Sequence, residues 1–482
     1  MEEAGAHMAR VAMRFFRAPG ECRVFLGKGH NGGDALVAAR RLAEQGWRVD
    51  LHEVFPREAL APLTRKKLEE MLFTRDLFLL PDSAFPNTRA RIVLDGLLGI
   101  GARGGLREPI REAALEINRL RLETGAAVFA LDLPSGLDGD TGEADPHAVV
   151  ADFTLCVGFA KRGLLADAAL DFVGRIAVLP LAGLTAQAGQ PPQRESVATP
   201  RGLSPLLPPR PFSTHKGRCG HVGIVAGSRG FTGAALMVAN AAVRAGAGLV
   251  SLFVTPDIYP VVASAALPEV MVTPVDCYLA VLDRPLDVLA IGPGLGRGDG
   301  PDILAVTEYF SGPMVVDADA LNLLAENPQS LRRAAGPRLL TPHPGEMGRL
   351  FPESAQLSRR ETAERFLASQ AENRAPVTLL LKGSRTLVAE GRDGNALRIS
   401  WNTTGHPGMA SGGMGDVLTG TCAALAGQGL APFDAARVGA WVCGRAAELA
   451  LSAGQSQESL AATDLPDQFG QAFRDLRDPH AC

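Results

Sequence analysis

The stretch Asn402–Asp416 reads NTTGHPGMASGGMGD, and VLTGTCAALAGQG follows it at 417–429. In the second segment the spacing of Val417, Leu418, Thr421, Ala424 and Leu425 gives one face of a helix. The residues Gly412–Gly415 therefore predict a turn at a helix N-terminus, where unhindered backbone N–H groups can hold a phosphoryl group. Asp416 stands where it could take a proton from an attacking hydroxyl. Taken alone, the pattern also fits a structural turn that a carboxylate caps.

The region before this stretch alternates strand-like apolar runs with helical patterns, which predicts a parallel sheet with helices on its faces. The runs are Val222–Ala226, Leu249–Val254, Val288–Ile291, Met314–Val316 and Val377–Leu381, with a helix over Gly233–Ala245. Ligands bind in loops at the carboxyl ends of such strands. Five loops of this kind carry glycine or polar residues: AGSRGFTGA (226–234), IGPGLG (291–296), DADALN (317–322), HPGE (343–346) and KGSRT (382–386).

These loops have ordinary interpretations when each is taken singly. His343 alone is typical of a buried, hydrogen-bonded histidine, and Lys382 alone is typical of a solvated surface charge. Packing does not readily explain five such loops after five strands. Together they indicate a binding site that includes Asp416.

The first part of the chain repeats the α/β pattern. Strand-like runs are Arg23–Leu26, Arg48–Val54, Arg91–Leu94, Val128–Leu133 and Phe153–Val157, with a helical pattern over Ala35–Gln45. Three strands lead into GKGHNGGD (27–34), into Asp95 followed by GIGARGG (99–105), and into Asp132 followed by Ser135. Glycine turns and helix-capping aspartates, Asp34 among them, are the alternative interpretation. GKGHNGG meets the dinucleotide fingerprint only in part, so an ordinary dehydrogenase is not favoured.

Length and composition place these patterns in two domains. The 482 residues exceed one ordinary domain, and the proline-rich segment 182–212 predicts a linker between domains at 1–181 and 213–482. Hydrophobic residues at 46% and charged residues at 21% are typical of a globular protein, and the net charge of -4 predicts no nucleic-acid partner. Seven scattered cysteines, no signal peptide and no membrane-spanning run predict a cytoplasmic protein without membrane attachment.

The motifs of the second part resemble the ribokinase-like superfamily and, more specifically, the ADP-dependent NAD(P)H-hydrate dehydratases. The resemblance implies a ribokinase-like three-layer domain that uses ADP or ATP as co-substrate together with Mg²⁺. It implies that the substrate meets Ala234, Gly294, Gly296, His343 and the catalytic Asp416. It implies that the adenine nucleotide meets Lys382, Gly383, Ser384, Arg385, Thr386 and Gly415.

The first part resembles the NAD(P)H-hydrate epimerases, through GKGHNGGDALVAARRL, DGLLGIGARGGLREPI, ALDLPSGLDGDTG and ADFTLCVGFAKRGL. The resemblance implies a Rossmann-like three-layer domain, a potassium site at Asn31, Asp95 and Ser135, and a catalytic or substrate-binding role for Asp132. The implied substrate-binding residues are His30, Asn31, Gly32, Gly33, Asp34, Gly99, Ile100, Gly101, Ala102, Arg103, Gly104, Gly105 and Asp132. This chain has His30 where the family usually has Asn, and Ala35 where it has Gly. Met1 falls within the family's first helix, so an upstream segment is expected to be missing.

The two resemblances imply two enzymes that act on one metabolite, hydrated NADH or NADPH. The first domain would interconvert its R and S epimers, and the second would dehydrate the S form to NAD(P)H with release of AMP and phosphate. A homo-oligomer is also implied. The alternative is a ribokinase-like vitamin or sugar kinase, with the first domain a non-catalytic nucleotide-binding module, because the glycine turn with its aspartate serves such kinases too.

Overall fold

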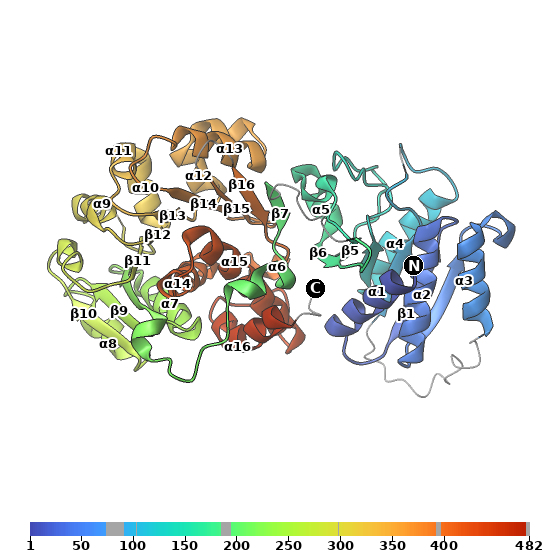
Figure 1. The fold of residues 1–482 in the computed structure, drawn as a ribbon, viewed down its shortest axis with the longest axis horizontal. Coiled ribbons are helices and arrows are strands. Elements are labelled where there is room, and N and C mark those ends of the chain that lie inside the picture. The colour runs from blue at the N-terminus through green and yellow to red at the C-terminus, as the bar shows by residue number, and fades with distance from the viewer. Residues whose placement is uncertain (74–90, 103, 185–193, 297, 392–396, 479–482) are drawn as a thin grey trace. The chain divides into compact units, whose positions relative to one another are not determined.

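A computed structural model describes residues 1–73, 91–102, 104–184, 194–296, 298–391 and 397–478. The chain divides into two compact units, Met1–Gln190 and Pro191–Ala481 (Figure 1). Each is an α/β domain built on a sheet with helices on both faces.

The first unit is built on a sheet whose described strands are all parallel, in the order β2-β1-β3-β4-β5-β6. The strands are β1 (Glu21–Leu26), β2 (Arg48–Glu53), β3 (Arg91–Gly96), β4 (Ala127–Leu131), β5 (Phe153–Val157) and β6 (Arg175–Leu179). The helices are α1 (Glu2–Phe15), α2 (His30–Glu44), α3 (Pro62–Phe73), α4 (Ile110–Thr124) and α5 (Leu170–Val173).

Strand β1 illustrates why this sheet is covered on both faces. Successive side chains of a strand point to opposite faces. Val24 and Leu26 pack into the core under α1, α2 and α3, whereas Phe25 packs into the core under α4. All three are fully buried, so the uninterrupted apolar run VFL is what a parallel strand covered on both faces requires.

The second unit contains a sheet in the order β10-β9-β8-β11-β12-β13-β14-β15-β16-β7, parallel from β10 to β14. Its strands are β7 (Glu195–Val197), β8 (His221–Val225), β9 (Leu249–Val254), β10 (Val270–Pro274), β11 (Val288–Ile291), β12 (Met314–Val316), β13 (Arg338–Leu340), β14 (Val377–Leu381), β15 (Leu387–Glu390) and β16 (Arg398–Trp401). Its helices are α6 (Pro200–Leu203), α7 (Thr232–Arg244), α8 (Tyr259–Ala265), α9 (Gly300–Tyr309), α10 (Ala318–Glu326), α11 (Pro328–Arg332), α12 (Pro344–Leu350), α13 (Arg359–Ser369), α14 (Met414–Gly427), α15 (Pro432–Ser452) and α16 (Asp464–Arg477).

Helix α14 lies between α7 and α15 and packs on β8, β11 and β12; it is drawn in red in the left half of Figure 1. Its approach to α7 depends on Gly420, where a Cβ atom would lie 2.1 Å from the carbonyl oxygen of Val238. Small residues let two helix backbones come this close. Residues Val417–Ala426 are all buried, so the helix that starts at the glycine turn is fixed in the core.

The predicted strands are all observed with similar bounds, and three of the other predicted segments differ from the structure. Helix α2 begins at His30 rather than Ala35, so His30–Asp34 form the first turns of a helix and not a loop. The close packing of Gly32 explains this start, because a Cβ atom there would lie 2.2 Å from the carbonyl oxygen of Gly27. Helix α14 likewise begins within the predicted glycine turn, at Met414.

The third difference concerns the proline-rich segment 182–212. Its later part contains β7, which pairs with β16, and α6, whose Leu203 is fully buried in the core of the second unit. The proline Pro200 occupies the first turn of α6, where a missing backbone N–H costs nothing. Proline enrichment therefore marks structured chain from residue 195 onward.

Three further observations cover the described residues as a whole. No helix among them is long and apolar enough to cross a membrane. Their six cysteines are all free thiols, and five of these are buried. They contain no group of three or more His, Cys, Asp or Glu side chains that could hold a metal ion.

Candidate active sites

The glycine turn of the second unit leads directly into α14. Gly413 caps the helix with a φ of 89°, a left-handed conformation that side chains other than glycine rarely adopt. A Cβ atom at this position would also lie 2.5 Å from the sulfur of Met237 on α7. Both constraints require glycine and leave the first N–H groups of α14 uncovered by a side chain. These groups can therefore bind an anion.

Asp416 lies in the first turn of α14 and is half-buried. In the described part of the chain, no hydrogen bond to its carboxylate is found. Burial and, to a smaller extent, the charge of the nearby Asp317 raise the pKa of Asp416 to about 7, although Lys382 opposes the shift. A carboxylate with this pKa can accept a proton from an alcohol near neutral pH more effectively than an ordinary aspartate.

Lys382, which follows β14, faces the same site. Its ammonium group donates to the carboxylate of Asp317 at 2.7 Å and lies 3.7 Å from that of Glu346. Burial lowers the pKa of Lys382, but the two carboxylates outweigh that effect and raise it overall. A Cβ atom on Gly415 would lie only 3.2 Å from the ammonium nitrogen, so glycine at this position leaves room for the lysine. Lys382 is therefore held charged beside the start of α14.

The remaining residues of the predicted nucleotide site form the turn between the antiparallel strands β14 and β15. Gly383 and Ser384 are exposed, whereas Arg385 is only 4% exposed and its carbonyl accepts from Arg359 at 2.6 Å. The hydroxyl of Thr386 donates to the carbonyl of Gly383 at 3.2 Å, which closes the turn. The tip of the turn is thus accessible while its base is fixed.

Three predicted substrate residues meet at the carboxyl ends of β8 and β11. A Cβ atom on Gly294 would lie 2.9 Å from the Cβ of Ala234, so these two positions are in contact. Gly294 and Gly296 both have positive φ, at 63° and 68°, and the N–H of Gly296 donates to Asp319 at 2.8 Å. The structure thus brings these predicted residues close together, and Asp319, which lies beside them, was not among the predicted site residues.

His343 caps α12. Its Nδ1 accepts from the N–H of Gly345 at 3.0 Å, and Glu346 returns a bond to the N–H of His343 at 2.8 Å. The side chain is 51% exposed, so His343 is hydrogen-bonded without being buried. This capping box also places Glu346 beside Lys382.

In the first unit, Asp132 occupies a strained position after β4. Its φ of 70° is unusual for a residue other than glycine, and such strain is concentrated at functional sites. Its carboxylate accepts from the ammonium of Lys161 and from the N–H of Val157. Burial raises the pKa of Asp34 to about 6; the amino group of Met1 opposes the shift and Asp132 adds to it. Asp34, Asp132 and Lys161 thus converge at one edge of the sheet.

A continuous chain of hydrogen bonds joins the three predicted potassium ligands. The Asn31 amide donates to the carbonyl of Leu98 at 2.7 Å, and the N–H of Leu98 donates to the Ser135 hydroxyl at 3.0 Å. That hydroxyl donates to Asp95 at 2.7 Å. Asp95 is fully buried, and burial raises its pKa to about 6. In the parts of the chain that are described, no lysine or arginine pairs with Asp95.

The second glycine loop of the first unit is only partly close to these groups. A Cβ atom on Gly99 would lie 3.5 Å from the Cβ of Asn31, whereas Ile100 is 67% exposed. Gly101 and Gly104 have no atom within 4 Å of an added Cβ, and Gly105 has only Asp145, at 3.0 Å. Ala102 donates to the carbonyl of Gly99 at 3.0 Å. Arg103 lies outside the described residues.

Comparison with known proteins covers both units. Residues 222–469 match the family model described as NAD(P)H-hydrate dehydratase, and residues 1–163 match the YjeF-related protein N-terminus. A bifunctional NAD(P)H-hydrate repair enzyme of Moorella thermoacetica is 36% identical over 99% of this chain and 92% of its own length. The chain belongs to the bifunctional NAD(P)H-hydrate repair enzyme family. A relative of that name from Escherichia coli is 37% identical over 92% of this chain and 83% of its own length.

A solved structure supports the fold of the second unit. A ribokinase-like superfamily protein from Enterococcus faecalis aligns with a TM-score of 0.50 and 22% identity, over 61% of this chain and 100% of that one. The predicted ribokinase-like fold of the repair enzyme's second unit is thereby confirmed.

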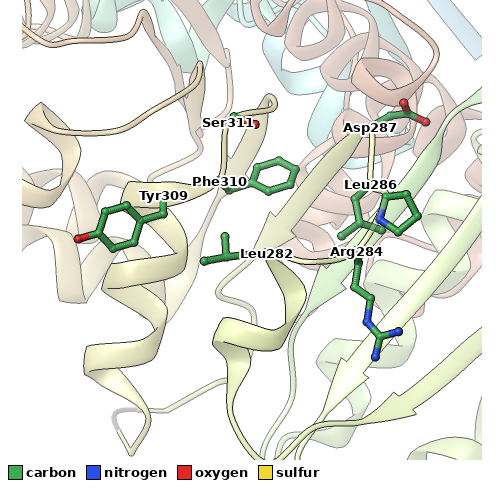
Figure 2. Close-up of a pocket in the computed structure, with 8 residues that line it drawn as sticks. Leu282, Arg284, Leu286, Asp287, Tyr309, Phe310 and Ser311 are labelled. Carbon is green, nitrogen blue, oxygen red and sulfur yellow. The ribbon is translucent and has the colours of Figure 1, made fainter.

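Figure 2 shows a separate pocket in the second unit. Its lining includes Asp287, directly before β11, and Ser311, shortly before β12. The pocket therefore opens at the amino ends of these strands, whereas the glycine loops lie at the carboxyl ends. Its lining residues are Leu282, Arg284, Pro285, Leu286, Asp287, Tyr309, Phe310 and Ser311, and they include none of the predicted site residues.

Proposed function

We propose that this chain repairs hydrated NADH and NADPH in two steps. The first unit interconverts the R and S epimers at ring carbon 6, and the second dehydrates the S epimer at the expense of ADP or ATP. The observation that carries the second step is the half-buried carboxylate of Asp416 beside the open N-terminus of α14. Family membership supports both steps.

The proposed dehydration begins with phosphoryl transfer. The hydroxyl oxygen on ring carbon 6 attacks the terminal phosphorus of the nucleotide while Asp416 takes the hydroxyl proton. The bond from phosphorus to the nucleotide breaks, and with ADP as donor AMP departs. The first N–H groups of α14 stabilise the charge on the transferred group, and Lys382 adds a positive charge nearby.

The phosphate ester then breaks down to the product. Hydroxide is a poor leaving group and phosphate is a good one, so the lone pair of the ring nitrogen expels phosphate from carbon 6. Loss of a proton from the adjacent ring carbon restores the double bond of NADH or NADPH. His343, Ala234, Gly294 and Gly296 are proposed to line the substrate side of this site.

The cofactors follow from the residues available. We assign magnesium no protein ligands, because the described residues hold no suitable group of three or more side chains, and its usual place is on the nucleotide phosphates. The first unit fits potassium better. Asp95 is a buried carboxylate without a cationic side-chain partner in the described chain; the Ser135 hydroxyl contacts it directly, and the Asn31 amide is linked to Ser135 through the backbone of Leu98.

The epimerase step is assigned to Asp132, Asp34 and Lys161. Their carboxylates and ammonium group meet at the carboxyl edge of the first sheet, next to the predicted substrate residues His30 and Asn31. Asp132 is proposed to contact the hydrated ring, with Lys161 holding its carboxylate. As the resemblance implies, we propose a cytoplasmic homo-oligomer that acts on small molecules only.

The test is incubation of the full chain with chemically hydrated NADH and either ADP or ATP. Chromatography follows both epimers, while the absorbance of the reduced nicotinamide and the release of inorganic phosphate report the product. Repair predicts equal amounts of NADH and phosphate. A sugar or vitamin kinase would instead leave a stable phosphorylated product and no free phosphate, which would refute the proposal.

A further inference from the structure

Asp317 links three parts of the second active site that are distant in sequence. It follows β12, and only 1% of the residue is exposed to solvent. One oxygen accepts from the Lys382 ammonium after β14 at 2.7 Å, and the other accepts from the Thr419 hydroxyl on α14 at 2.8 Å. A single buried carboxylate thereby connects the predicted nucleotide turn to the helix that carries Asp416.

The position of the Lys382 ammonium matters because two other carboxylates are close to it. Glu346 on α12 lies 3.7 Å away, and Asp416 on α14 interacts with the same charge. An ammonium that moved to Asp416 would neutralise the base with a direct ion pair and lower its affinity for a proton. Asp317 makes the shorter of the two measured contacts to the ammonium, at 2.7 Å against 3.7 Å for Glu346, and so holds the ammonium away from that arrangement.

We propose that Asp317 is a positioning residue for phosphoryl transfer: it anchors Lys382 for the nucleotide and leaves the carboxylate of Asp416 free for the substrate hydroxyl. This inference rests on the proposed function of the second unit. The atoms that react are those of Asp416, substrate and nucleotide, and Asp317 acts on them only through Lys382, Thr419 and its own charge.

The charge of Asp317 acts in the same direction as its geometry. The charged groups that face Asp416 are Asp317 after β12, Lys382 after β14 and Glu346 on α12. After burial, the charge of Asp317 is the largest cause that raises the pKa of Asp416. Removal of that charge is therefore expected to make Asp416 a weaker base that loses its proton at lower pH.

The test compares kcat and the pH profile of kcat/KM in the full-length wild type and in Asp317→Asn, Asp317→Glu and Thr419→Val. In Asp317→Asn we expect kcat to fall about tenfold or more, and the acid limb of the profile to move to lower pH by about one unit. Asp317→Glu keeps the charge, so its acid limb stays near that of the wild type. An Asp317→Asn enzyme that is folded and keeps the wild-type limb overturns the proposal.

Thr419→Val covers the case in which Asp317→Asn does not fold. Thr421→Val is its matched control, because Thr421 lies on the same buried helix but donates to the carbonyl of Val417 at 2.8 Å rather than to Asp317. We expect kcat to fall about threefold or more in Thr419→Val and to stay close to wild type in Thr421→Val. Equal kcat values in the two variants would contradict the role of Asp317.

The failure of this inference can be told apart from failure of the proposed function. If the wild-type chain releases no phosphate from hydrated NADH and nucleotide, the proposed function itself is refuted. An active wild type with an unmoved acid limb in folded Asp317→Asn removes only the positioning role.

Discussion

The carboxylate of Asp416 combines two properties that rarely occur together in a stable protein. It is half-buried, and hydrogen bonds within the described chain do not satisfy it. Burying a charge without a partner costs free energy, so such a group is expected where chemistry requires it. Substitution by asparagine removes the charge and keeps the shape.

Asp416→Asn should abolish dehydration while nucleotide binding remains. The amide cannot accept the hydroxyl proton, so we expect kcat to fall about a thousandfold or more. NADH formation from hydrated NADH measures the rate, and equilibrium titration with ADP measures binding. A variant that keeps half of the wild-type rate would remove Asp416 from the chemistry.

The pH dependence of the wild-type rate follows from the same carboxylate. A general base must be ionised, so with a pKa of about 7 in the free enzyme, kcat/KM should rise from pH 5 to about 7 and level off above it. Initial rates in buffers of constant ionic strength measure this limb. A rate independent of pH between 5 and 8 would show that another group, or none, takes the proton.

Asp416→Asn should also make the protein more stable at alkaline pH. The pKa of Asp416 in the folded state is raised above the ordinary value of 3.8, so ionisation of this carboxylate lowers the free energy of unfolding. The penalty is absent below about pH 4, grows up to about pH 7 and is constant above it. Scanning calorimetry at pH 8 should give the variant a Tm higher by about 2–4 °C, and at pH 4 little difference. Equal Tm values at pH 8 would contradict the buried charge.

At the scale of one element, the glycine turn before α14 provides a matched pair of substitutions. Gly413 has a φ of 89° and its added Cβ would meet Met237 at 2.5 Å, whereas Gly412 is exposed with nothing within 4 Å. We expect Gly413→Ala to reduce kcat about tenfold or more, because the first N–H groups of α14 would shift, and to cost about 1–2 kcal/mol of stability. Gly412→Ala should stay within about twofold of wild type. Steady-state rates and urea unfolding of both variants measure the contrast. Equal rates and equal unfolding free energies in the two variants would show that Gly413 is no more constrained than Gly412.

The elements themselves could be predicted where the sequence carries a complete local signal. The run VTLLL of β14 is fully buried and apolar, so its strand was predicted, as was the helix after the glycine turn. The four-residue strands β15 (LVAE) and β16 (RISW) have shorter apolar runs than β14 and were not predicted. The contact of Asp317 with Lys382 spans 65 residues, and its contact with Thr419 spans 102. Only the folded sheet brings those side chains together. The sequence motifs therefore indicated the loops that contain Asp317 and Lys382 but not the contacts of Asp317 with Lys382 and Thr419.

The start of α2 shows a different limit of the sequence pattern. Glycines at 32 and 33 usually indicate a loop, because glycine weakens helices. Here both glycines lie in a helix. A Cβ on Gly32 would overlap the carbonyl of Gly27 at 2.2 Å, and one on Gly33 would meet the Met1 sulfur at 2.6 Å, so a larger residue would not fit at either position. Close packing, rather than flexibility, is what requires these glycines.

At the scale of the whole molecule, the two units are proposed to act on the two epimers of one substrate. The dehydratase site holds its groups in one fixed geometry, so it should accept only one configuration at ring carbon 6. An epimerase in the same chain would then determine whether a mixed population is consumed completely. These two proposed roles can be tested separately by a substitution in the first unit of the full-length chain.

Asp132→Ala should leave the dehydration of the S epimer unchanged and stop net conversion once that epimer is used up. Asp132 accepts from Lys161 and Val157 in the first unit, so its loss should not reach Asp416 in the second. Chromatography of a mixed preparation of hydrated NADH with excess ADP follows both epimers over time, and a protein-free sample gives the spontaneous epimerisation to be subtracted. His30→Asn is a suitable control, because it places the residue usual in the resembled family at an exposed position and should retain full conversion. Complete consumption of both epimers by Asp132→Ala at the wild-type rate would exclude Asp132 from epimerisation.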